Sequence, residues 1–298
     1  MRAQHVSAIT GPPKEDCITL DLDLYQRALK LQKSNKNNWV LCAGTLHIVF
    51  ALLHALGKTV DSSGLDICAI EKGLYTAASL RKIYVGKAYK RGMEYHLTQV
   101  LAIMILKFDA IFLRVPSPEL FATLEFFLKA VHNNQDDILS VYNQLIKEMQ
   151  PVLKEMKSTS NQSGIAEFLT AYTDQVYNLL QVIECCRLAD FEGFLTNLDC
   201  SIRYLFSKDL LNYARLMPVY VGDMYTLKAD DPVTWEALTS GDFVVNNSNI
   251  AFSNLFTDQA LEQEIKKTEI TWWNSWDKST GNCVRTSFDH ISISLSNG

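Results

Sequence analysis

A long, uninterrupted helical pattern constrains the fold of this chain more than any other feature of its sequence. From about residue 62 to 231, apolar side chains recur at three- and four-residue spacing, as in Leu97, Val100 and Leu101. Shorter segments with strand-like patterns lie on both sides of this region. Such an order is typical of a sheet covered by helices. We therefore expect an α/β fold with dominant helix content, in which a small sheet platform is interrupted by a large all-α insertion.

Local signals divide this pattern into elements. Alternation over 17–24 and the apolar run 39–42 predict two strands, and a helix should begin at Thr45. Further helices are expected over about 136–157, 165–189, 191–207, 210–225 and 252–267, with a strand over 241–245. The expected organisation is a disordered segment over 1–16, the first part of the α/β core over 17–60, the helical insertion over 61–231, the last part of the core with an acidic helix over 232–268, and an irregular tail over 269–298.

Composition excludes several classes of protein. The chain has 28 basic and 33 acidic side chains and a net charge of −5, without the basic surplus of a dedicated nucleic-acid domain. Its seven cysteines include no CxxC pair, which argues against a disulfide framework or a zinc ribbon. The start lacks the apolar core of a signal peptide, and Lys107 and Asp109 interrupt the most apolar segment. We expect an intracellular protein without a membrane span.

Two groups of acids are candidate metal ligands. Asp21 and Asp23 alternate along the first predicted strand and should therefore share one of its faces. Glu262 lies on the late predicted helix, with Asp258 one turn before it. Carboxylate oxygens suit Mg²⁺, and a pair of such ions can activate water and stabilise a leaving phosphate oxygen. Acids on a strand and a helix also commonly face solvent, so spacing alone leaves both readings open.

A cationic segment could contact nucleic acid despite the acidic average. Five cations lie within eleven residues with Tyr84 and Tyr89 among them: Arg81, Lys82, Lys87, Lys90 and Arg91. Cations could contact phosphates while the aromatic rings stack on bases. The alternative is an ordinary solvated helix face. His47 and His54 share a helix face without a third ligand nearby, and the sequence contains no GxSxG, P-loop or GxGxxG motif.

Five ordered stretches resemble an uncharacterised family of transposon-derived proteins found in animal genomes. The stretches ITLDLDLYQRAL and AGTLHIVFALLHALGK resemble the family's T-F-D-x-P-L-Y strand and G-D/G-F-H-x-x-x-S-F-L-G-x-I-G segment. GKAYKRGMEYHLTQ resembles Y-x-R-A-x-R-x-H-x-L, and NYARLMPVYVGDM resembles A-R-W-L-P-V-Y-L-R-D-M. TDQALEQ resembles D-Q-A-x-E-Q. Together they span roughly residues 17–265.

The resemblance implies a transposase core similar to ribonuclease H, with a helical insertion similar to that of hAT transposases. In such cores an early-strand Asp, a second Asp and a late-helix Glu bind two Mg²⁺ for DNA strand cleavage and transfer. Carried onto this chain, Asp21 becomes the first catalytic carboxylate and Glu262 the last, with Asp23 as a further metal ligand. His47 and Asp258 fall within the matched motifs. The resemblance also implies that DNA is the partner and that the protein acts in the nucleus. It allows a homo-oligomer.

The chain also departs from this pattern. Thr45 stands where many relatives have the second Asp, and a neutral hydroxyl cannot replace a carboxylate in neutralising two divalent cations. The start lacks a separate DNA-reading domain, and the end does not follow the family. We therefore expect a truncated, degenerate copy with impaired catalysis. The alternatives are a non-catalytic helical interaction scaffold in the cytoplasm and a translated relic. No sequence motif supports a small-molecule enzyme in the helical half.

Overall fold

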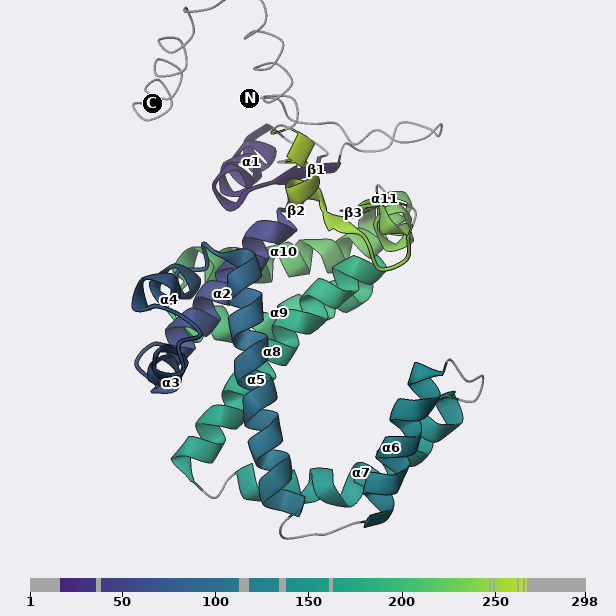
Figure 1. The fold of residues 1–298 in the computed structure, drawn as a ribbon. Helices are drawn as coiled ribbons and strands as arrows, with labels where there is room; N and C mark the ends of the chain where they lie inside the picture. The colour runs from purple at the N-terminus through teal and green to yellow at the C-terminus, as the bar shows by residue number, and fades with distance from the viewer. Residues whose placement is uncertain are drawn as a thin grey trace, which may run out of the picture. The chain divides into compact units, whose positions relative to one another are not determined.

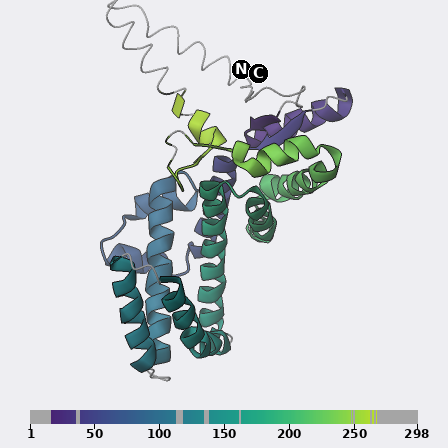
Figure 2. The ribbon, with the colours of Figure 1, turned by 90° about the vertical axis from the view of Figure 1, so that its right-hand side faces the viewer.

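The computed structural model describes residues 17–35, 39–112, 118–133, 138–160, 163–246, 248, 250–261, 263, 264 and 266 (Figure 1). The chain separates into two compact units. Unit 1 comprises residues 1–47, 186–189 and 231–298, and unit 2 comprises residues 48–185 and 190–230. The segments expected to be disordered (1–16) and irregular (269–298) lie outside the described residues. Helices dominate the described residues, as the sequence predicts (Figure 2). Their strands form two separate two-stranded sheets, one parallel and one antiparallel.

Unit 1 begins with a strand–helix–strand arrangement. Strands β1 (Cys17–Leu20) and β2 (Val40–Ala43) pair in parallel, with Cys17 opposite Val40 and Leu20 opposite Ala43. Helix α1 (Leu22–Asn35) connects them, because parallel neighbours require a crossover. All four residues of β2 are buried, whereas those of β1 are half-buried. Helix α2 (Thr45–Val60) follows, and the boundary between the units lies inside it, after His47.

The end of the chain completes unit 1. Helix α11 (Pro232–Ala237) and the turn η1 (Leu238–Asp242), in which Gly241 has a φ of +112°, lead into strand β3 (Val244–Val245), which pairs antiparallel with β4 (Leu255–Phe256). Residues 257–261 are helical. Arg187 contacts β4 and the residue before it. Its guanidinium donates to the Asn254 carbonyl and lies 5.8 Å from the centroid of the Phe256 ring.

Three expected element boundaries in unit 1 are wrong. The predicted strand over 17–24 ends at Leu20, because Asp21 caps a helix that begins at Leu22. The strand expected over 241–245 is limited to β3, since η1 occupies the preceding residues. The late helix starts at residue 257 rather than 252, after the short strand β4.

Unit 2 is helical in its described residues. After α2 come α3 (Leu65–Glu71), α4 (Ala77–Tyr84), α5 (Tyr89–Phe112), α6 (Pro118–His132), α7 (Ile138–Ser160), α8 (Gly164–Leu188), α9 (Phe191–Ser207) and α10 (Leu211–Asp230). Helices α9 and α10 pack together, as do α6 and α7. Among the described residues, no helix combines the length and apolar character needed to cross a membrane.

A close backbone contact joins α2 to α4. A Cβ atom at Gly57 would lie 2.3 Å from the carbonyl oxygen of Tyr84 and 2.4 Å from its Cα. Gly86 has a φ of +73°, and a Cβ there would lie 2.5 Å from the Phe50 carbonyl oxygen. These distances leave no room for a side chain, so the two glycines allow α2 to approach the end of α4.

A histidine–tyrosine pair is buried in unit 2. His96 on α5 is 1% exposed, and its Nδ1 lies 2.8 Å from the hydroxyl oxygen of Tyr172 on α8. Burial lowers the pKa of His96 to about 3, because the protonated imidazole would lose its hydration. His96 is therefore a neutral core residue at physiological pH.

Candidate functional site: an acidic edge in unit 1

The predicted site residues of unit 1 gather where β1 and β2 end. Asp21 follows β1 directly, and Gly44 follows β2, with its N–H donating to the Leu20 carbonyl at 2.7 Å. Thr45 and His47 belong to the first turn of α2. Asp258, on the helical segment 257–261, reaches the same place. We call Asp21, Thr45, His47 and Asp258 the acidic edge.

Asp258 caps α2 from more than 200 residues away in the sequence. Its Oδ1 accepts the N–H of Leu46 at 3.0 Å, and its Oδ2 accepts the N–H of His47 at 3.3 Å. These are the donors that a capping side chain at the preceding residue would satisfy, but that residue is Gly44. The negative charge also suits the positive end of the helix dipole. Asp258 therefore supplies the cap that Gly44 lacks.

The Asp258 carboxylate has further partners. His47 Nδ1 lies 3.0 Å from Oδ2, and the N–H of Gln259 donates to Oδ1 at 3.2 Å. The side chain of Asp258 is 11% exposed and that of His47 is 35% exposed. Both carboxylate oxygens are thus held by protein donors in a mostly buried position.

Gly44 makes room for this carboxylate. A Cβ at this residue would lie 2.7 Å from Asp258 Oδ2 and 3.2 Å from the Leu20 carbonyl oxygen. The first distance is too short for atoms that are not bonded, so any larger residue would displace the carboxylate. The absence of a side chain at residue 44 is a requirement of the site.

The other predicted acids have different surroundings. Asp21 is half-buried, and its Oδ1 accepts the N–H of Leu24 at 2.8 Å as the N-cap of α1. Asp23 is exposed in the first turn of that helix, so the expectation that Asp21 and Asp23 share a strand face is wrong. Thr45 is buried at the first position of α2. Glu262 lies outside the described residues.

The structure describes only part of the expected magnesium centre, because Glu262 lies outside the described residues. Mg²⁺ is bound through carboxylate oxygens, and at the acidic edge Asp21 uses its Oδ1 and Asp258 uses both of its oxygens to accept backbone N–H groups. Thr45 contributes a neutral hydroxyl where the resemblance implies the second Asp. Within the part of the chain that the structure describes, no group of three or more His, Cys, Asp or Glu side chains is arranged to hold a metal ion.

The cationic segment comprises the end of α4, the connection over 85–88 and the start of α5 in unit 2. Arg81, Lys82, Lys87, Lys90 and Arg91 are all exposed, as phosphate contacts would require. The tyrosines between them face other rings: Tyr84 lies edge-on to Tyr95, and Tyr89 lies edge-on to Phe50. Both rings are half-buried, so the cations are the more exposed groups of this segment.

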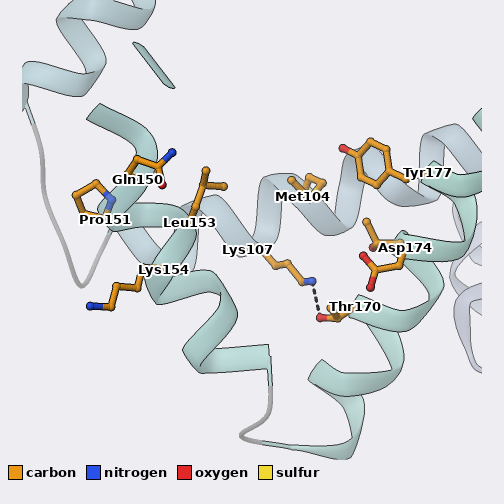
Figure 3. Close-up of a pocket in the computed structure, with 10 residues that line it drawn as sticks. Met104, Lys107, Gln150, Pro151, Leu153, Lys154, Thr170, Asp174 and Tyr177 are labelled. Carbon is orange, nitrogen blue, oxygen red and sulfur yellow. Dashed lines mark hydrogen bonds between the residues drawn. The ribbon is translucent and has the colours of Figure 1, made fainter. Parts of the chain in front are cut away.

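A groove of about 960 Å³ opens between α5, α7 and α8 in unit 2 (Figure 3). Lys107 extends from α5 across it and donates to Thr170 Oγ1 at 2.9 Å. Burial lowers the pKa of Lys107, while the nearby Asp174 raises it. Met104, Leu153 and Tyr177 supply apolar walls. A half-buried ammonium beside apolar surface could hold a carboxylate attached to an apolar group.

Sequence reasoning misses two features of unit 1. The sequence indicates Gly44 only as part of a turn, because its role depends on Asp258 approaching from far along the chain. The sulfur atoms of Cys17 and Cys42 lie 3.4 Å apart on neighbouring strands. Their positions in two successive predicted strands are the signal that could have suggested this contact.

Comparison with known proteins identifies the family. Residues 5–271 match the family described as Domain of unknown function (DUF8702), so the chain belongs to that family. Neither the curated proteins nor the solved structures include a match.

Proposed function

We propose that this chain is a transposase-derived protein of ribonuclease H-like ancestry whose acidic edge no longer cleaves DNA. The observation that carries the proposal is the meeting of distant segments at one sheet edge. Asp21 ends β1, Thr45 and His47 follow β2, and Asp258 returns to the same place after a long helical region. A two-metal centre derived from such a core needs this convergence of a strand end and a late helix.

The loss of cleavage follows from the chemistry of the same edge. Asp258 is engaged by three backbone N–H groups and the His47 imidazole, so it acts as a structural cap. Thr45 lacks the charge that a second metal-binding position requires. The ancestral geometry is then kept because it positions the start of α2.

A reversion experiment tests the ancestry. Thr45→Asp adds the missing carboxylate one residue before Leu46, whose N–H binds Asp258, and Thr45→Asn adds an amide of similar size without charge. We expect Thr45→Asp to lower the melting temperature in metal-free buffer, because the new carboxylate and that of Asp258 then repel each other in a mostly buried position. Mn²⁺ should restore that temperature and bind about tenfold more tightly than to wild type, measured by electron paramagnetic resonance. Equal Mn²⁺ binding by Thr45→Asp and Thr45→Asn would refute the ancestry.

A nicking assay tests the loss of cleavage. Wild type and Glu262→Ala should nick supercoiled plasmid equally slowly with Mg²⁺ or Mn²⁺. Nicking by wild type that disappears in Glu262→Ala would mean that the centre is active, contrary to this proposal.

The second candidate function is a non-catalytic interaction scaffold. It is favoured by the packing of Tyr84 and Tyr89 against other rings, which reduces the aromatic surface available for stacking on bases. The groove around Lys107 offers a place for a partner's carboxylate instead.

DNA affinity separates the two candidates. If all five cations contact phosphates, affinity for a labelled duplex should fall roughly 500-fold between about 50 and 200 mM salt. Replacing Arg81, Lys82 and Lys87 by Ala should then reduce the slope of log affinity against log salt by about 3. A matched triple replacement of the exposed Lys30, Lys72 and Lys147 should leave it unchanged. Absence of binding at low salt would favour the scaffold.

A further inference from the structure

Two cysteines face each other across the parallel strands of unit 1. Cys17 begins β1 and pairs with Val40, while Cys42 pairs with Thr19. Because side chains alternate along a strand, the two cysteines are on the same face of the sheet, offset by two residues. Their sulfur atoms are 3.4 Å apart, within contact distance.

The surroundings give the two thiols different roles. Cys17 is half-buried and can be reached by a small oxidant, whereas Cys42 is only 6% exposed. The hydrogen bond from Cys42 lowers the pKa of the Cys17 thiol, and this effect outweighs burial and the charge of Asp242, which both raise it. A thiolate is the nucleophilic form of cysteine, so the outer thiol is the more reactive one.

We propose that Cys17 and Cys42 form an oxidisable dithiol that reacts with hydroperoxides and closes a reversible disulfide between β1 and β2. The Cys17 thiolate attacks one oxygen of hydrogen peroxide, the O–O bond breaks, and the second oxygen leaves as water after taking up a proton. The Cys42 thiol then attacks the sulfur of the Cys17 sulfenic acid, losing its proton as the hydroxyl leaves as a second water. The two sulfurs supply the two electrons that reduce the peroxide.

Other cysteines of the described residues lack this arrangement. Cys68 and Cys200 are exposed on α3 and α9. Cys185 and Cys186 are adjacent on α8, where successive side chains diverge around the helix. Burial and Asp190 raise the pKa of the Cys185 thiol, which makes it a poorer nucleophile. Oxidation should therefore select Cys17.

The position of the pair predicts how the bond behaves. Strand neighbours offset by two residues have Cα atoms roughly 7–8 Å apart. An unstrained disulfide spans about 4.4–6.8 Å, so β1 and β2 must move slightly closer for it to form. The bond should be readily reduced again. While closed, it ties the strand–helix–strand part of unit 1 into a covalent loop and restricts the unfolded chain.

Peptide mapping of the full chain tests the proposal. The reduced protein is treated with hydrogen peroxide, blocked with N-ethylmaleimide, digested and analysed by mass spectrometry. We expect one dominant linked peptide joining Cys17 to Cys42, which dithiothreitol removes. The oxidised protein should also melt at a higher temperature by tryptophan fluorescence, because all five tryptophans fall in the residue ranges of unit 1.

Variants identify the role of each thiol. In Cys42→Ser, dimedone should trap Cys17 as a sulfenic acid and no linked peptide should form. In Cys17→Ser, dimedone labelling in β1 and β2 should be absent. Cys200→Ser is the matched control and should give the wild-type yield of linked peptide. A wild-type protein in which Cys68 or Cys200 oxidises before Cys17, or in which other cysteines are linked preferentially, would overturn the proposal.

Discussion

The contact between Gly44 and Asp258 makes a quantitative prediction that a double-mutant cycle can test. Gly44→Ala places a methyl group 2.7 Å from the Asp258 carboxylate, which must move away from the start of α2. Overpacking of this kind costs about 1–3 kcal/mol, and we expect about 2 kcal/mol here. Asp258→Ala removes the cap from Leu46 and His47, at a cost of about 1–2 kcal/mol.

The double variant should be less destabilised than the sum of the single variants. Without the carboxylate, the methyl group added by Gly44→Ala would meet the Leu20 carbonyl oxygen at 3.2 Å, which small shifts can relieve. The coupling energy, the cost of the double variant minus both single costs, should be about −1 kcal/mol. Urea unfolding at pH 7 followed by tryptophan fluorescence measures it for unit 1.

Gly222→Ala controls for the change from glycine to alanine itself. No heavy atom lies within 4 Å of a Cβ at this helical residue of unit 2, so the substitution should stabilise that unit by up to about 1 kcal/mol, measured by urea unfolding with circular dichroism. A coupling energy of zero between Gly44→Ala and Asp258→Ala would refute the geometry of the acidic edge.

Two further predictions concern unit 2. Between pH 7.5 and 5, the unfolding free energy of wild type should fall by about 2 kcal/mol more than that of His96→Gln, measured by urea titration with circular dichroism. The sign follows because burial lowers the pKa of folded His96 to about 3, so the unfolded state binds the extra proton as pH falls below 6.5. Equal pH dependence would contradict the buried neutral histidine. Gly57→Ala should destabilise by about 3 kcal/mol, since its methyl would overlap the Tyr84 backbone. If Gly57→Ala lowers the unfolding free energy by less than about 0.5 kcal/mol, the size of an ordinary surface substitution, the close contact of α2 with α4 is ruled out.

The helical part of the fold could be predicted from local sequence. The expected helix over 191–207 is α9, because an apolar stripe and the capping residue Asp190 both act within a few residues. The error over 17–24 has a local cause as well. Alternation of Leu and Asp fits a strand, but Asp21 also suits the N-cap position of a helix. In the structure it caps α1, so the strand ends before it.

The acidic edge could be predicted only in part. Sequence motifs selected Asp21, Thr45, His47 and Asp258, and the structure places these residues at one end of the parallel strands. What Asp258 does there depends on a residue without a side chain, Gly44, and on an approach across 212 positions of sequence. No local pattern encodes such a contact. The family match adds no function that could have guided the prediction.

The long-range cap on α2 has a consequence for the order of events during synthesis. Residues 48–230, apart from 186–189, belong to unit 2 and are synthesised before Asp258. Unit 2 can therefore begin to form while the first turn of α2 still exposes its N–H groups to water. Maturation of unit 1 must wait for the distal residues, so ribosome-stalled chains ending before position 258 should resist protease in the helical region first.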